Sequence, residues 1–346
     1  PIYELSTVAL NLITIRGALT ALFAATIALV QTDIKRVVAY STVSQLAYMF
    51  IGCGVGAYSA GIFHLFTHAY FKALLFLGCG SVILAMHHEQ DVRSMGGLKR
   101  YLPITYWTFL LASLSISGIP GLAGFFSKDE ILLMAFNTEL GAGKFAWAIG
   151  TLVAFMTAFY SFRLFFLIFH GEFRGTEHQR EHLHESPRVV TIPLMLLAAG
   201  AVAAGWFGIP AVLGGSNHWA HFLEPVLGHP HMHLSHGVEL LLMATSVLAA
   251  AGGIALAWYL YRLRPELPGA LAGRFVGLHR LLVNKYFVDE AYIGLIVKPT
   301  LAFGRGVLLK VVDIGIIDGV VNGLPRLIGR LSERMRLVQD GQVSHY

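Results

Sequence analysis

Charge and cysteine are both scarce in this sequence. Asp, Glu, Lys and Arg make up only 13% of its 346 residues, whereas soluble globular domains carry about 25%. Hydrophobic residues make up 55%, and the mean hydropathy is +0.64. Because this small number of charges cannot cover a water-exposed surface, these values indicate an integral membrane protein. The net charge of +5 comes from Lys and Arg in short loops, and it gives no indication of a nucleic-acid partner.

The sequence patterns of redox and hydrolytic enzymes are also absent. Cys53 and Cys79 are the two cysteines, and both lie in apolar runs, which excludes a disulfide framework and favours buried thiols. There is no C-x-x-C-H motif, no P-loop, no nucleophile elbow and no G-x-G-x-x-G opening a helix after a strand. We therefore expect no cofactor in this chain.

What the sequence does contain is a series of apolar runs long enough to cross a bilayer as helices. They lie at about residues 5–31, 37–57, 60–86, 103–137, 145–169, 189–213 and 238–261. The fourth run is too long for one simple helix, and the glycines and proline of SISGIPGLAG interrupt it. It is either two short crossings or one crossing with an unwound middle.

The basic residues decide between these two possibilities. With a single crossing, every loop rich in Lys and Arg falls on one side of the membrane, which the positive-inside rule assigns to the cytoplasm. These loops hold Lys35, Arg36, Arg93, Lys99, Arg100, Arg174, Arg180, Arg188, Arg262, Arg264 and Arg274. Two crossings would move the loop 171–188 to the other side. The sequence therefore predicts one discontinuous helix.

Three titratable residues form a stripe inside the third run. His64, His68 and Lys72 are four residues apart, so they lie on one helical face. Two histidines on one face cannot ligate a haem iron from opposite sides. A lysine at mid-membrane costs about 2.5–3.5 kcal/mol on insertion scales, and such residues mark ion and proton paths. The alternative is that both histidines are core residues and that Lys72 snorkels to an interface.

A second polar cluster follows the interruption in the fourth run. Discontinuous membrane helices mark ion and substrate sites in transporters, and Lys128, Asp129 and Glu130 come directly after this one. These residues either take part in charge transfer or cap the helix at the interface. Lys35 is either an orientation anchor or the start of a water path towards the stripe. The hydrogen-bonding side chains after it are Tyr40, Ser41, Thr42, Ser44 and Gln45.

The pattern changes after about residue 265. Charges recur every few residues among Val, Ile and Leu, so a further membrane span is not expected there. The segment 266–346 is predicted to be a long amphipathic helix along the membrane surface, kinked at Pro299 and Pro325. The domains expected are thus a five-helix repeat at 1–171, two more spans at 172–265, and this helix. The chain starts at Pro1 rather than Met, almost on a hydrophobic run, so we expect a segment of a longer protein.

Two loops are rich in histidine, which is a common metal ligand. They carry His178, His182 and His184, and His218, His221, His229, His231, His233 and His236. No acidic or cysteine ligand accompanies these histidines at a defined spacing. A zinc or copper site is therefore the weaker interpretation, and solvated loops are expected.

Four segments together carry a resemblance to a known family. ALVQTDIKRVVAYSTVSQLAYMF, HLFTHAYFKALLFLGCGSVI, HHEQDVRSMGGL and GIPGLAGFFSKDEIL closely resemble chain L of bacterial NADH:quinone oxidoreductase, respiratory complex I, and its mitochondrial counterpart, subunit 5. The resemblance covers essentially the whole chain. It implies an antiporter-like subunit with two inverted five-helix repeats, of which this chain would hold the second and lack the first, and would also lack the last transmembrane helix.

The resemblance also implies roles for particular residues. Lys35, His64, His68 and Lys72 match the central proton relay of the family. Lys128 matches the terminal lysine of its second broken helix, with Asp129 beside it.

The implied function is proton translocation in the bacterial inner membrane, with FMN, iron–sulfur clusters and quinone in other subunits. Partners would be chain M, other membrane subunits along the long helix, and the lipid bilayer. The alternatives are the large subunit of a multi-subunit cation/proton antiporter, or a mainly structural brace of the membrane arm.

Overall fold

The computed structural model describes residues 6–228, 234–338 and 341–345. These form helices joined by loops, with one isolated bridge between Asp33 and Asp91. His229, His231 and His233 lie outside the described residues. The chain divides into two compact units, Pro1–Val283 and Asn284–Tyr346. The domain boundaries that the sequence suggests, near residues 171 and 265, stay a prediction.

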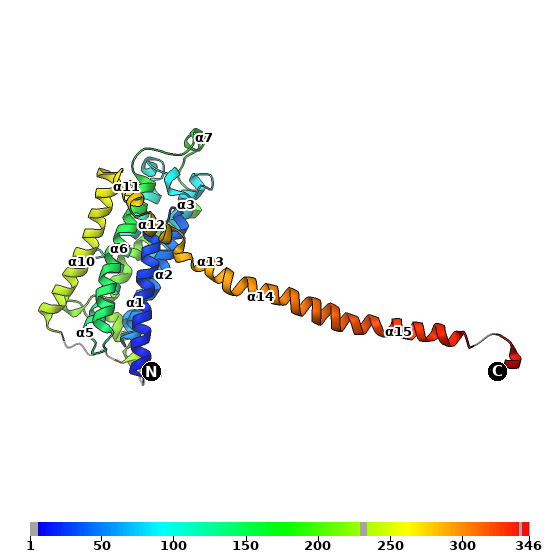
Figure 1. Cartoon of the computed structure of the whole chain (residues 1–346). Helices are drawn as coiled ribbons and strands as arrows, with labels where there is room; N and C mark the ends of the chain where they lie inside the picture. Colours follow the sequence, from blue (N-terminus) through cyan, green and yellow to red (C-terminus); the bar gives the residue numbers. More distant parts are fainter. Residues whose placement is uncertain (1–5, 229–233, 339–340, 346) are drawn as a thin grey trace. The chain divides into compact units, whose positions relative to one another are not determined.

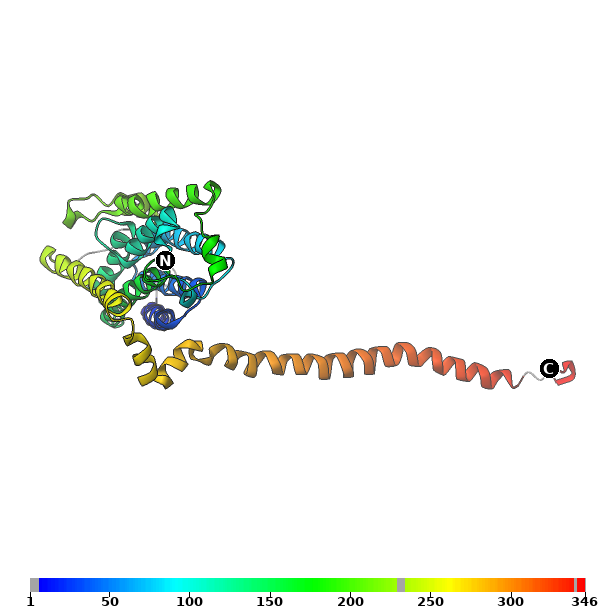
Figure 2. The same cartoon turned by 90° about the horizontal axis from the view of Figure 1, so that it is seen from above.

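The first unit is a bundle of helices (Figures 1 and 2). It contains α1 (Thr7–Val30), α2 (Ile34–Gly54), α3 (Tyr58–Ala85), α4 (Pro103–Ser117), α5 (Ala123–Asn137), α6 (Gly143–Phe169), α7 (Glu177–Glu181), α8 (Arg188–Ala203), α9 (His218–Leu227), α10 (His236–Trp258), α11 (Leu267–Arg274) and α12 (Val276–Val283). Six helical segments in the described residues are long and apolar enough to cross a membrane. They are Thr7–Val30, Ile34–Gly54, Tyr58–Ala85, Gly143–Phe169, Arg188–Gly208 and His236–Leu263. The predicted all-α membrane fold is confirmed.

The seventh crossing is the predicted discontinuous helix, made of α4 and α5. Tyr106 and Phe109 on α4 contact the ring of Phe169 at the end of α6, whereas Phe136 on α5 contacts Trp147 near its start. The two halves therefore lie along opposite ends of α6. Each has 15 residues, which rise about 22 Å, less than the roughly 30 Å of a bilayer core. They cross the membrane once between them, as the sequence predicts.

Glycines determine the geometry of the break. Gly118 ends α4 in the left-handed conformation, with φ of 84°. Gly124 lies so close to α4 that an added Cβ would be 1.9 Å from the carbonyl oxygen of Ser115. Its N–H also donates to the Ser115 hydroxyl at 3.2 Å. The start of α5 is thus held against the end of α4 by contacts that only glycine allows.

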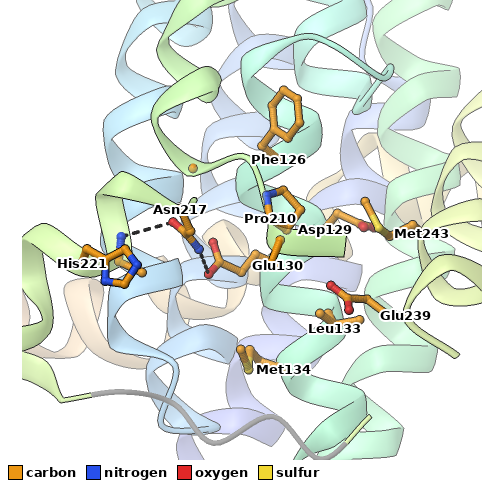
Figure 3. Close-up of a pocket in the computed structure, with 13 residues that line it drawn as sticks. Phe126, Asp129, Glu130, Leu133, Met134, Pro210, Asn217, His221, Glu239 and Met243 are labelled. Carbon is orange, nitrogen blue, oxygen red and sulfur yellow. Dashed lines mark hydrogen bonds between the residues drawn. The ribbon is translucent and has the colours of Figure 1, made fainter. Parts of the chain in front are cut away.

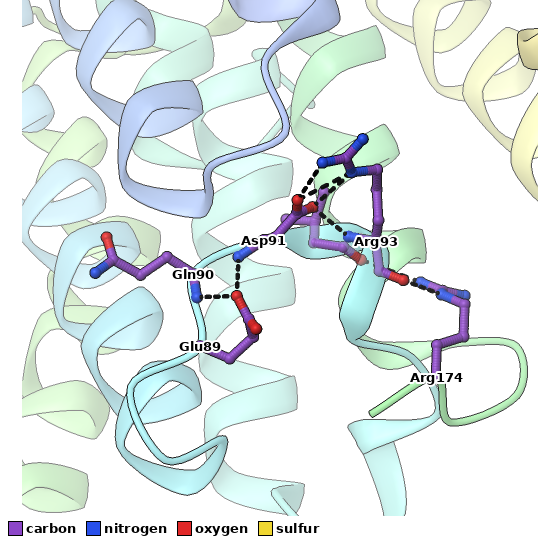
Figure 4. A network of polar contacts seen from close by, with 6 residues as sticks. Glu89, Gln90, Asp91, Arg93 and Arg174 are labelled. Atoms are coloured by element: carbon purple, nitrogen blue, oxygen red, sulfur yellow. Dashed lines mark hydrogen bonds and ion pairs between the residues drawn. The ribbon is translucent and has the colours of Figure 1, made fainter. Parts of the chain in front are cut away.

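The loops at one end of the bundle are joined by polar contacts (Figure 4). The N–H of Ile34 donates to the carbonyl of Gln90, and that of Val92 donates to the carbonyl of Thr32. Asp91 accepts hydrogen bonds from the Arg93 side chain. The Arg174 guanidinium donates in turn to the carbonyls of Arg93 and Val92, at 2.9 and 3.2 Å. These contacts fix the connections after α1, α3 and α6 to one another.

The second unit is one long helical segment, drawn from orange to red in Figures 1 and 2. It contains α13 (Val288–Tyr292), α14 (Lys298–Phe303) and α15 (Asp318–Arg336), joined by π-helical turns at Ile293–Val297 and Gly304–Ile317. The helix continues through Pro299 and Pro325. Lys285, Tyr286 and Phe287, which have positive φ, interrupt the helical backbone before α13.

Candidate functional site

His64 joins two other helices in the buried interior of the bundle. Its Nδ1 lies 2.9 Å from the hydroxyl of Ser127 on α5, and its Nε2 lies 3.2 Å from Oε1 of Gln45 on α2. An amide oxygen only accepts, so with this amide orientation Nε2 carries the hydrogen and Nδ1 accepts from Ser127. Thr67 adds a contact of 2.7 Å between its hydroxyl and that of Ser127. All four side chains are buried.

Buried polar groups continue from Gln45 towards the start of α2. The hydroxyl of Tyr160 on α6 donates to the Ser41 hydroxyl at 2.8 Å, and Ser41 lies one turn before Gln45 on α2. A cavity of about 10 Å³ lies beside Ser41, Tyr160 and Ser113, which is close to the space that one water needs. The Ser113 hydroxyl has no hydrogen-bond partner among the described residues. Polar groups therefore follow one another from Ser41 to Ser127 across α2, α6, α3 and α5.

His68 and Lys72 continue the stripe on α3 and are also buried, at 6% and 4% exposure. The ring centroid of His68 lies 6.1 Å from that of His64. Nε2 of His68 and Nζ of Lys72 have no hydrogen-bond partner among the described residues. The placement excludes the sequence-based alternative in which Lys72 snorkels to an interface. Instead, the bundle holds an ammonium group away from solvent, which is costly unless the group can lose its charge or find a partner.

Lys128 is held by the end of the other half-helix. Its Nζ donates to the carbonyls of Ile116 and Ser117, at 3.1 and 3.0 Å. These carbonyls end α4, where the unsatisfied acceptors of a helix carry partial negative charge. Lys128 is 3% exposed, so it does not cap the helix at an interface. The break thus creates a buried binding site for a cation, and Lys128 occupies it.

Acidic side chains gather on the other side of α5 (Figure 3). Asp129 is 7% exposed and Glu239 on α10 is 5% exposed, and Ser246 donates a hydrogen bond to Asp129. Glu130 accepts from the side chain of Asn217 at 3.3 Å. All of these except Ser246 line a cavity of about 200 Å³. Residues 127–130 therefore connect the His64 contact, the Lys128 site and an acid-lined cavity within about one helical turn.

Lys35 is the predicted site residue that the structure does not bring to the others. It is exposed in the first turn of α2, and the buried Val38 lies between it and Ser41, where the buried array begins along that helix. The water path suggested from Lys35 to the stripe stays a prediction.

Several residues of the site were missed by sequence reasoning. Ser127 and Tyr160 carry no signal of their own, because a hydroxyl in an apolar run is common. Glu239 and Arg163 carry one, since each is a charged residue inside an otherwise apolar run. Arg163 is buried, donates to the carbonyl of Gln31 at 2.8 Å, and also bonds the Tyr261 hydroxyl at 3.0 Å.

Comparisons with known proteins agree with this architecture. Residues 1–157 match the family model described as NADH:quinone oxidoreductase/Mrp antiporter. NADH-quinone oxidoreductase subunit L of Neisseria meningitidis serogroup A is 43% identical over 376 aligned positions, which cover 100% of this chain and 55% of that protein. NADH-ubiquinone oxidoreductase chain 5 of Phytophthora infestans is 41% identical, and the alignment covers 100% of this chain and 53% of that protein. The chain spans about half the length of the curated relatives it matches.

A solved structure shares the fold. One chain of the Mrp complex from Dietzia sp. DQ12-45-1b aligns with this chain with a TM-score of 0.52 and 24% identity. The alignment covers 87% of this chain and 33% of the Mrp chain. At this identity the likeness concerns the fold alone. The matched family model, together with alignments that cover the whole of this chain and about half of each relative, leads to one conclusion: the chain is similar to subunit L and chain 5 of NADH-quinone and NADH-ubiquinone oxidoreductases.

Proposed function

We propose that this chain translocates protons as part of a membrane subunit of NADH:quinone oxidoreductase, while other subunits carry out the redox chemistry. The observation that supports this function is the buried array from Ser41 to Ser127, with Lys72 and Lys128 beside it. The driving reaction is taken from the names of the relatives, which are subunits of NADH- or NAD(P)H-quinone oxidoreductases.

His64 is the central relay in this proposal. Its two ring nitrogens contact different helices, so a proton taken up on one nitrogen can leave from the other. The proposed path runs from Lys72 and His68 through His64 and Ser127 to Lys128. Asp129 and the acid-lined cavity beside it form the outlet.

The two lysines act as charge switches. Burial favours the neutral form of a lysine, and a nearby negative charge or dipole favours the charged form. Lys128 faces the carbonyls at the end of α4, whereas Lys72 has no such partner among the described residues. A proton moving from Lys72 to Lys128 therefore passes from a site that disfavours charge to one that stabilises it.

FMN, iron–sulfur clusters and quinone belong to other subunits in this proposal. The chain lies in the bacterial inner membrane. Its Lys- and Arg-rich loops all fall on one side when α4 and α5 make a single crossing, and the positive-inside rule assigns that side to the cytoplasm. The second unit lies along the membrane surface against chain M and neighbouring subunits. Its α15 supports this contact, since exposed Val320, Leu324, Leu327 and Leu331 recur on one helical face.

The exposed face of α1 is a further partner surface in the proposed assembly. Arg16 lies exposed in the middle of this membrane helix, beside a groove of about 400 Å³ lined also by Thr20, Val43 and Phe50. An arginine facing lipid at this depth costs about 2.5–3.5 kcal/mol. We therefore assign this face to a neighbouring membrane segment that offers a hydrogen-bond acceptor.

The proposed function is tested in the reconstituted oxidoreductase complex. Lys72→Met and Lys128→Met keep the volume of the side chain and remove its charge. We expect both to lower the number of protons translocated per electron, while Lys144→Met, at an exposed position of α6, leaves it unchanged. An unaltered ratio in both site variants, with assembly and NADH oxidation intact, contradicts the proposal. Cation/proton exchange that proceeds without NADH would instead support the antiporter alternative.

A further inference from the structure

Three exposed histidines from distant parts of the sequence meet at one end of the first unit. His87 follows α3, whereas His178 lies on α7 and His182 directly follows it. Their ring centroids are 5.5, 5.6 and 4.8 Å apart for the pairs 87–178, 87–182 and 178–182. One ring nitrogen from each lies within 4.8 Å of the other two. One of the two histidine-rich loops thus brings two imidazoles next to a third, His87, which belongs to neither of those loops.

Local structure explains why they meet. Thr176 and Gln179 form a capping box that starts α7, so His178 and His182 are one turn apart on the same face. The amide of Gln179 also donates to the carbonyl of Met86 at 3.1 Å. Met86 precedes His87, whose φ of 52° turns the chain sharply after α3. A single side chain therefore holds α7 against the residue next to the third histidine.

The tautomer of one ring is set by the backbone. Nδ1 of His182 lies 2.9 Å from the carbonyl oxygen of His178. A carbonyl only accepts, so Nδ1 carries the hydrogen and Nε2 presents a lone pair. A ring N–H that donates to a backbone carbonyl is also the usual support of a metal-bound histidine.

We propose that His87, His178 and His182 bind one divalent transition-metal ion of the zinc class. Imidazole nitrogen suits Zn²⁺, Cu²⁺ and Ni²⁺, and a water completes the fourth position because the site is exposed. Nitrogens bound to one tetrahedral zinc are about 3.4 Å apart, as follows from Zn–N bonds of about 2.0–2.1 Å. Rotation of the exposed side chains closes the remaining difference from 4.8 Å.

The bound ion clamps the end of α3 to α7. The ion adds a link between loops that Arg174 and Arg93 already join. The loop after α3 also contacts the connection between α1 and α2, because the N–H of Ile34 donates to the carbonyl of Gln90. An ion that binds only the closed loops stabilises them by mass action. The site makes no use of the proton path, so the proposal does not depend on the proposed function.

The test is zinc titration of the purified full chain by calorimetry at about pH 7.5, without a polyhistidine tag and after removal of metals with EDTA. His87→Asn removes the ligand that comes from the separate loop. Its matched controls are His88→Asn and His184→Asn, which replace the exposed histidines next to the cluster. We expect His87→Asn to weaken one zinc site by about tenfold or more, as for lost metal-site contacts in other proteins, and the controls to change it by less than about twofold.

Hydrogen exchange locates the ion and separates it from zinc bound by other histidines. Zinc should slow exchange of backbone amides near residues 86–92 and 176–184 in the unaltered chain, and not in His87→Asn. Equal affinities in all variants, equal losses in the controls, or protection elsewhere in the chain would each overturn the proposal.

Discussion

Ser127 is the residue that joins the two halves of the candidate site. Its hydroxyl contacts Nδ1 of His64 at 2.9 Å and the Thr67 hydroxyl at 2.7 Å, and the next residue is Lys128. No other described side chain bonds to His64 from α5. In the proposed path, proton transfer between α3 and α5 therefore depends on a single hydroxyl.

Ser127→Ala tests this dependence. Leaving the buried ring nitrogen of His64 without its partner costs about 1–3 kcal/mol, and a barrier raised by about 1.4 kcal/mol slows a step tenfold. We expect proton translocation in the reconstituted complex to fall about tenfold or more. Ser127→Thr should restore it. Thr151→Ala is the control, because the Thr151 hydroxyl bonds back to Trp147 of its own helix. Unchanged pumping in Ser127→Ala would show that protons take another route.

His170 makes the loop region sensitive to acid. It lies just beyond α6 among the rings of Tyr106, Phe165 and Phe166. Burial, with the positive charges of Arg262 and Lys99, lowers the pKa of His170 from 6.5 to about 4. The unfolded chain therefore binds this proton before the folded one does, so stability falls as the pH drops from about 6.5 to about 4.

This pH dependence is measured by comparison with His170→Asn, which does not titrate. We expect the thermal midpoint of the purified protein to drop between about pH 7.5 and pH 5, and to drop less in the variant. Equal drops in the two proteins would mean that His170 does not contribute.

At the scale of elements, the contact between α4 and α5 depends on Gly124. A methyl group there would lie 1.9 Å from the carbonyl oxygen of Ser115, and the other atoms that it would meet are also backbone atoms of α4. Gly124→Ala should lower the free energy of unfolding by about 1–3 kcal/mol, as overpacking does in other cores. Gly80→Ala on α3 is the control, since a Cβ there meets nothing within 4 Å. Denaturant titration of both variants checks this, and equal stabilities would contradict the close approach.

Much of the element level was predictable from sequence. The apolar runs fixed the membrane helices to within a few residues, and the basic loops selected one broken crossing, because both signals depend on local composition. The stripe of His64, His68 and Lys72 followed from helical spacing alone. The bond from His64 to Ser127 and the meeting of His87 with α7 could not be predicted. They depend on how elements far apart in sequence pack and on a left-handed turn at His87.

At the scale of the whole molecule, the first unit has its own core and the second has none. Buried residues are found along α1 to α10, whereas the described residues of Val288–Arg336 are almost all exposed. Deletion of residues 284–346 should therefore change the free energy of unfolding of the first unit by no more than about 0.5 kcal/mol. In the proposed assembly it should prevent incorporation into the complex, because the deletion removes α15 and with it the apolar side that binds neighbouring subunits.

Two measurements separate these effects. Thermal unfolding of the purified truncated chain reports on the first unit, and native electrophoresis of membranes reports on assembly. A truncated chain that still assembles and pumps would exclude a bracing role for the long helix. A truncated chain that loses its own stability would show that the first unit needs the second.

The order of residues at the start of α5 has a mechanical consequence. Ser127 and Lys128 are neighbours on a half-helix that begins only a few residues earlier, at Ala123. A small rotation of α5 about its axis would therefore shift both contacts together, that of Ser127 with His64 and that of Lys128 with the end of α4. In the proposed proton path, a change at one of these contacts is therefore coupled to a change at the other, which would let the inward and outward sides of the path open at different moments.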